Sequence, residues 1–228
     1  MSRWVVLLLF VVVPGCSDLT DGAGGVVELE VSVPAVTTVE VGELLQLSAR
    51  ALDRDGNPVT APITWRTTDA ALTVDDTGLI TGVAPGPGQV QAFAGSLASE
   101  RVAITVIARA DTLVLVGDSV VVVSPEAAAS APLVVQLQSF SLAGPLLDRP
   151  VVYTITSPPD LGVRSVELPG AVLIDTISTG ASGLNQTITV NRVAGVPSPD
   201  TAIVQVRSYR ASGADVPGSG QRFIVLFQ

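Results

Sequence analysis

Apolar and polar side chains alternate along most of this chain with a period of two residues. Val27, Leu29, Val31 and Val33 alternate with polar residues, and residues 45–51 repeat the pattern. Successive side chains of a β-strand point to opposite faces, so the alternation predicts half-buried strands. No segment of helical length is free of both Gly and Pro while keeping an apolar stripe of helical period. The pattern therefore predicts an all-β protein.

Residues 26–108 are expected to form a first domain of short strands. Turn-forming residues occupy 53–58, 75–78 and 86–88, and strands separated by turns about every ten residues are typical of a β-sandwich. Trp65 is expected to fill the core between the two sheets. The predicted strands are 26–33, 37–41, 45–51, 63–66, 72–74, 79–81, 89–94 and 101–107.

Residues 109–228 are expected to form a second, more diverged β-sandwich. Segments 112–116 and 119–123, with the turn between them, echo 37–41 and the turn that follows it, and Tyr153 is expected to take the place of Trp65. The Tyr and Phe residues are expected in the cores rather than on a sugar-binding platform. The predicted fold class is therefore all-β, with tandem β-sandwiches. The further predicted strands are 133–137, 151–156, 184–193, 201–209 and 221–227, with a turn over 142–150.

The N-terminus has the layout of an export signal. Arg3 precedes an apolar run over residues 4–13, which is too short to span a bilayer as a helix. Val13-Pro14-Gly15-Cys16 resembles the lipobox of bacterial lipoproteins, although Pro14 departs from the usual residue. The resemblance implies a signal peptide over 1–15 and lipidation of Cys16, followed by a flexible tether over 16–25. The alternative is an ordinary secretory signal with an incidental Cys.

The single cysteine and the charge narrow the possible chemistry. A lone Cys16 cannot form a disulfide within the chain, so packing alone must hold the sheets together. The net charge is −9, all twelve basic residues are Arg, and the chain has no His. An acidic chain without basic clusters counts against a nucleic-acid partner, and the lack of His excludes His-based catalysis and His metal ligands. Carboxylate-only mechanisms remain open.

Several short motifs follow one another in the order seen in a known domain family. They are VGE at 41–43, ITW at 63–65, LTVD at 72–75, TGLITG at 77–82 and APG at 84–86. Residues 26–108 thereby resemble the bacterial Ig-like domain (group 2), which also occurs in intimin- and invasin-type surface proteins. The second domain is loosely similar to the group 1 bacterial Ig-like domains. The resemblance implies tandem Ig-like β-sandwiches, a surface location and no catalytic residues.

Two acidic loops are candidate sites. Asp53, Asp55 and Asn57 have the spacing of a calcium loop, but no Glu stands at the twelfth position, where Thr64 lies. These residues are also good turn formers, and a hairpin loop is the favoured interpretation. Asp75 and Asp76 are adjacent on a strand pattern and point to opposite faces, so a turn is favoured over a catalytic pair.

The predicted function is that of a non-catalytic cell-surface lipoprotein, either binding a ligand or acting as an envelope spacer. The expected partners are the membrane, through the lipid on Cys16, and a surface glycan or protein; no enzyme activity, cofactor or nucleic acid is expected. The outer membrane is the preferred location, because Ser17 rather than Asp follows the Cys. The alternatives are a carboxylate-dependent carbohydrate-active enzyme and a calcium-rigidified stalk.

Overall fold

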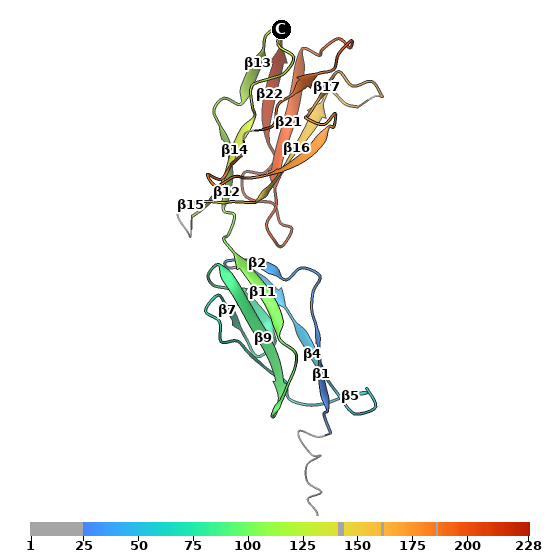
Figure 1. The fold of residues 1–228 in the computed structure, drawn as a ribbon, viewed down its shortest axis with the longest axis vertical. Coiled ribbons are helices and arrows are strands. Elements are labelled where there is room, and N and C mark those ends of the chain that lie inside the picture. Colours follow the sequence, from blue (N-terminus) through green and yellow to red (C-terminus); the bar gives the residue numbers. More distant parts are fainter. Residues whose placement is uncertain (1–24, 141–143, 161, 186) are drawn as a thin grey trace, which may run out of the picture.

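The computed structural model describes residues 25–140, 144–160, 162–185 and 187–228, and every regular element in them is a β-strand. Two sandwiches follow one another along the long axis, the first carrying β1 to β11 and the second β12 to β22 (Figure 1). The prediction of tandem Ig-like β-sandwiches is confirmed. The predicted signal peptide and Cys16 lie outside the described residues.

Three sheets make up the first sandwich. One has the order β1-β4-β5, and another has the order β3-β8-β7. The third has the order β10-β9-β11-β2, and β6 also pairs with β9. The strands are β1 (Glu28–Ser32), β2 (Thr38–Glu40), β3 (Leu44–Gln46), β4 (Ser48–Leu52), β5 (Pro58–Val59), β6 (Thr64–Arg66), β7 (Leu72–Val74), β8 (Leu79–Gly82), β9 (Gly86–Ala94), β10 (Leu97–Ala98) and β11 (Val102–Ile107).

The first core forms where the inward faces of these strands meet. Along β11, buried and exposed residues alternate as the sequence pattern predicts. Trp65 on β6 is 8% exposed and belongs to the core, as expected. Gly78 lies beneath its indole, and a Cβ on this glycine would come within 2.8 Å of Trp65 Cε2. The β7–β8 turn therefore needs glycine both for its positive φ of 83° and for this close approach.

In the described residues the second sandwich also has three sheets, and its main sheet has five strands, as in the first. Its sheets have the orders β13-β22-β21-β16-β18, β12-β14-β15 with β19 beside β14, and β17-β20. The strands are β12 (Thr112–Val116), β13 (Val120–Val123), β14 (Val134–Ser139), β15 (Gly144–Pro145), β16 (Pro150–Ser157), β17 (Val166–Glu167), β18 (Ile174–Ser178), β19 (Leu184–Asn185), β20 (Asn191–Arg192), β21 (Thr201–Ser208) and β22 (Gln221–Phe227).

A separate apolar cluster fills the second sandwich. Tyr153 on β16 is fully buried in it, and its hydroxyl donates a hydrogen bond to the backbone oxygen of Leu133 at 3.2 Å. Burial raises the pKa of this phenol, so Tyr153 stays neutral and acts as a core residue with one satisfied polar group.

Some predicted strands differ from the observed ones. Segment 45–51 is interrupted at the buried Leu47, where the chain leaves β8 and joins β1 instead. Residues 86–88 form the start of β9 rather than a turn, and Gly88 there accommodates the side chain of Leu72. Segment 184–193 is reduced to the two-residue strands β19 and β20.

The aromatic prediction is only partly correct. Trp65, Tyr153, Phe223 and Phe227 are buried. Phe140 is 69% exposed and Tyr209 is 40% exposed, because each lies just beyond the end of a strand. Phe93 is only partly buried because it lies on the outward face of β9, opposite the core-facing Ala92 and Ala94.

Candidate functional site

A buried carboxylate stands at the junction between the two sandwiches. Glu40 ends β2, which pairs in parallel with β11 so that Glu40 lies opposite Ile107, the last residue of the first sandwich's final strand. The Glu40 backbone also lies close to β8, and Gly82 on that strand allows this, because a Cβ there would lie 2.6 Å from the Glu40 carbonyl oxygen. The Glu40 side chain is 0% exposed. The fold therefore places one full negative charge where the chain leaves the first sandwich.

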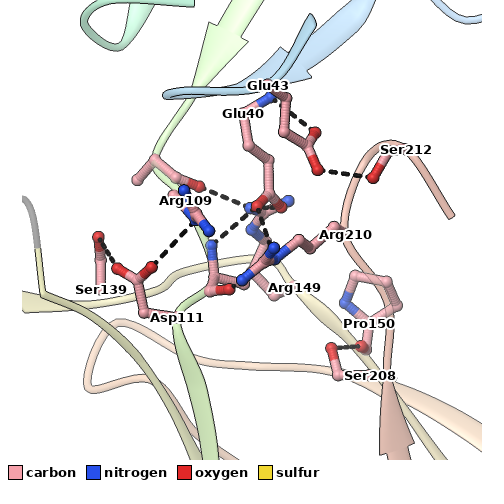
Figure 2. Close-up of polar contacts among 12 residues, drawn as sticks. Glu40, Glu43, Arg109, Asp111, Ser139, Arg149, Pro150, Ser208, Arg210 and Ser212 are labelled. Atoms are coloured by element: carbon pink, nitrogen blue, oxygen red, sulfur yellow. Dashed lines mark hydrogen bonds and ion pairs between the residues drawn. The ribbon is translucent and has the colours of Figure 1, made fainter. Parts of the chain in front are cut away.

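Three groups from beyond the first sandwich contact this carboxylate (Figure 2). Ala110 donates its backbone N–H to Glu40 Oε2 at 2.9 Å. Arg149 forms a hydrogen-bonded ion pair with Oε1, and the Nε of Arg210 lies 4.0 Å from Oε2. The two arginine side chains are only 11% and 16% exposed, so both cations and the anion are largely withdrawn from water.

Separate loops of the second sandwich hold the two arginines. Arg149 precedes β16. Its backbone oxygen accepts the Thr179 N–H at 2.9 Å, and its N–H donates to the Thr179 hydroxyl oxygen at 3.0 Å. Arg210 follows β21 and begins a turn closed by its N–H bond to the Ala214 oxygen at 2.8 Å. Hydrogen bonds within the second sandwich therefore hold the backbone of both arginines beside the linker.

The same arginines also bind the linker, residues 108–111. Arg149 Nη2 donates to the Ala108 oxygen at 2.6 Å, and Arg210 Nε donates to the Ala110 oxygen at 3.1 Å. Asp111 accepts the Phe140 N–H at 2.7 Å and lies 3.2 Å from Arg109 Nε. The linker is therefore bonded on both sides and is not a free hinge.

A second direct contact joins the sandwiches beside the first. Ser212 donates its hydroxyl hydrogen to Glu43 Oε1 at 2.6 Å, while Glu43 Oε2 accepts the Glu40 N–H at 3.2 Å (Figure 2). Removing one partner of a buried pair leaves an uncompensated charge, which typically costs about 3–5 kcal/mol. We call Glu40, Glu43, Arg149, Arg210 and Ser212 the junction, because their contacts join the two sandwiches directly.

The candidate calcium loop joins β4 to β5. Asp53 Oδ1 accepts the N–H groups of Asp55 and Asn57, both at 2.9 Å. The Asn57 bond in particular lowers the pKa of Asp53. No group of three acidic, His or Cys side chains with metal-binding proximity occurs among the described residues. The calcium hypothesis stays a prediction, which thermal melting with and without calcium would test.

The second acidic loop joins β7 to β8 and uses the same bonds. Asp75 Oδ1 accepts the N–H of Thr77 at 2.8 Å and that of Leu79 at 3.0 Å, two and four residues onward, as Asp53 does. It also accepts the Thr77 hydroxyl hydrogen at 2.7 Å, and this bond is the main cause of the lowered pKa of Asp75. Both aspartates therefore stabilise hairpin turns, which is the favoured interpretation of each motif.

One groove of the first sandwich carries several carboxylates. This groove has a volume of about 430 Å³, lies between β1 and the start of β11, and is lined by Glu28, Glu30 and Glu100. Glu30 is engaged by Arg50 at 2.6 Å, and all three glutamates are exposed. Glycoside hydrolysis by paired carboxyls uses two of them flanking a bound sugar ring. The enzyme alternative stays a prediction, and a hydrolysis assay on polysaccharides would test it.

The sequence reasoning missed the junction. Glu40 falls in the predicted strand over 37–41, and its partners lie up to 170 residues away in turns. Glu40 and its neighbour Val39 are both buried, which breaks the alternation, but this burial is visible only in the structure. In the described part of the chain no helix has the length and apolarity needed to cross a membrane.

Comparison with known proteins supports the fold of the first sandwich. Residues 29–106 match the family model of the bacterial Ig-like domain (group 2), as the motifs predicted. No curated protein matches the chain.

Solved structures with similar chains include the adhesin InvE of Yersinia pseudotuberculosis, at 17% identity and a TM-score of 0.42, with 88% of this chain and 58% of that chain covered. The chain thus spans just over half of that adhesin. The fibronectin(III)-like modules of Clostridium thermocellum CbhA match at 16% identity and a TM-score of 0.40, covering 87% and 92%. The D0-D1 domain of intimin matches at 12% identity and 0.31, covering 88% and 98%.

Proposed function

We propose that this chain is a non-catalytic cell-surface lipoprotein that acts as a stiff spacer. The export signal over 1–15 and the lipid on Cys16 would place the N-terminal end of the first sandwich at the membrane. The family match of residues 29–106 supports a role outside the cytoplasm, because the intimin- and invasin-type proteins that share the domain are surface proteins.

The observation that carries this proposal is the bonded junction around Glu40. Two sandwiches joined by a flexible linker would sample many relative orientations, whereas a fixed joint keeps them end to end (Figure 1). The nine residues of β9 span roughly 30 Å at about 3.3 Å per residue. Two such units in line would hold the far end of the second sandwich roughly 60 Å from the anchored end.

Stiffness is measured by pulsed dipolar spectroscopy between one spin label in each sandwich. Exposed Thr105 on β11 and Thr176 on β18 are suitable label sites in a Cys16→Ser background. We expect a single narrow distance distribution that broadens on Glu40→Ala and stays narrow in the matched control Glu30→Ala, which removes an exposed ion pair. A broad distribution in the parent protein would refute the spacer role.

The anchor is tested separately in cells. A fatty-acid analogue carrying an alkyne should label the full chain, and Cys16→Ser should abolish the label and release the protein from the membrane fraction. Labelling of the Cys16→Ser protein, or the absence of label in the parent, would refute lipidation at this position.

A further inference from the structure

A second groove on the first sandwich combines features that favour a ligand. It has a volume of about 510 Å³, within the range of small-molecule sites, and lies over the outward face of β6, β9 and the start of β11. The residues that matter for binding are Arg66, Asp69, Gln89, Gln91, Phe93 and Arg101. We call these six residues and the space between them the outer groove.

The register of the sheet brings the two arginines to either side of one strand. Arg66 on β6 lies opposite Gln91 on β9. On the other side of β9, Val102 on β11 lies opposite Val90. The two strands are antiparallel, so Arg101, just before β11, lies next to Gln91. Trp65 and Val90, their neighbours in sequence, face the core, so Arg66 and Gln91 face outward. The outer groove therefore has a cation on each flank and an amide between them.

Neither arginine forms an ion pair among the described residues. The Arg66 guanidinium carbon lies over the Phe93 ring, 5.0 Å from its centroid, which is a cation–π contact. Arg101 donates to Gln89 Oε1 at 3.3 Å. The single acid of the groove, Asp69, accepts the Gln89 N–H at 2.6 Å. The groove thus carries a net positive charge on a chain whose net charge is −9.

We propose that the outer groove binds an acidic saccharide, with its carboxylate or sulfate groups paired to Arg66 and Arg101. Guanidinium groups match the geometry of such oxyanions and bond them in pairs. The Gln89 and Gln91 amides suit sugar hydroxyls, and the partly exposed Phe93 ring supplies an apolar contact. The strongly negative chain disfavours a densely charged nucleic acid, for which two cations are too few.

This proposal goes beyond the spacer role and does not depend on it, because the outer groove lies within the first sandwich alone. It departs from one expectation drawn from the sequence, that the Phe residues lie in the cores rather than on a sugar-binding platform. Failure of the anchor or of the stiff joint would leave the outer groove unaffected, and failure of saccharide binding would leave the spacer role standing.

The test is calorimetric titration of the full chain in detergent with acidic oligosaccharides. The probes are hexamers of galacturonate, of hyaluronate and of heparin, with maltohexaose as the neutral control. We expect at least one acidic hexamer to bind and the neutral hexamer not to bind. Absence of binding by all three acidic hexamers at millimolar concentration, or equal binding of maltohexaose, overturns the proposal.

Substitutions locate the binding. Arg66→Gln and Arg101→Gln should each weaken the acidic hexamer about tenfold, the loss expected for one charge-assisted bond. Arg222→Gln is the matched control, since Arg222 is also exposed on a sheet face without an ion pair among the described residues. Phe93→Leu should weaken binding less, because the charges stay. Equal weakening by Arg222→Gln, or none by Arg66→Gln and Arg101→Gln, overturns the assignment to this groove.

Discussion

Replacing Glu40 by alanine tests whether the junction between the sandwiches is energetically significant. The substitution removes the acceptor for the Ala110 N–H and the counter-charge of Arg149 and Arg210, whose side chains are 11% and 16% exposed. A hydrogen bond to a charged group contributes about 1.5–3 kcal/mol, and breaking a buried ion pair costs about 3–5 kcal/mol. Because both arginines can become hydrated if the joint opens, we expect the lower end, about 3 kcal/mol.

Urea unfolding of residues 17–228 measures this loss without adding ions that would screen the cluster. Trp65 is the only Trp in that range, so its fluorescence reports the first sandwich, while circular dichroism reports both. We expect the circular dichroism midpoint to fall by the equivalent of about 3 kcal/mol. We also expect the fluorescence transition to separate from it, because the sandwiches would then unfold independently.

Glu30→Ala is the control for this measurement. It deletes the same carboxylate, but from an ion pair with Arg50 whose side chains are 49% and 61% exposed. Exposed pairs contribute about 0–1 kcal/mol, so the two variants should differ by at least about 2 kcal/mol. Equal losses of unfolding free energy for Glu40→Ala and Glu30→Ala would show that the buried ion pairs of Glu40 stabilise the fold no more than an exposed pair does. The argument that the junction is energetically significant would then fail.

Three further variants test other parts of the fold. Gly78→Ala should cost clearly more than Gly117→Ala in urea unfolding: both glycines have φ near 80°, worth about 1 kcal/mol, but only at Gly78 does a Cβ collide with Trp65. Equal costs would exclude the collision. Folding lowers the pKa of Asp75, so the ionised side chain stabilises the fold above its unfolded pKa, and this stabilisation is lost as the pH falls through its folded pKa. The difference in unfolding free energy between the parent and Asp75→Asn should therefore shrink from pH 7 to pH 2. A difference that stays constant would contradict this. Tyr153→Phe should cost about 1 kcal/mol by loss of one buried hydrogen bond, and no change would show that the bond is not formed.

The strand pattern of the first sandwich was predictable because its strands face a core on one side and water on the other. The period of two in β1 and β11 then fixes which side chains are buried. Two of the three predicted turns are present, because Asp53 and Asp75 each accept backbone N–H groups two and four residues onward. The third, at 86–88, is the start of β9 instead.

Prediction failed where pairing partners are distant in sequence. The echo of 37–41 in 112–116 suggested equivalent strands, but β12 pairs antiparallel with β14, whereas β2 pairs in parallel with β11. The strand that matches β2 is β13, which runs parallel to β22. β18 was missed because its side chains are nowhere fully buried and show no clear apolar face. Local alternation identifies a strand but not its neighbour.

The candidate sites were harder to predict than the strands. Asp53 and Asp75 were found because their turns are local in sequence. Glu40 and Arg149 are 109 residues apart, and the two arginines of the outer groove lie on β6 and just before β11. Neither set has a spacing that a single sequence could reveal, because turns of the second sandwich complete the first set and strand pairing assembles the second.

The parallel pairs β2–β11 and β13–β22 have a mechanical consequence. In each pair the strand nearer the N-terminus lies beside the last strand of its sandwich, and both run in the same direction. A force that pulls the two chain ends apart would slide these strands past each other, loading all their hydrogen bonds in shear at once instead of opening them singly. Each sandwich would thus meet tension along the chain with its terminal strands in the geometry that resists rupture best.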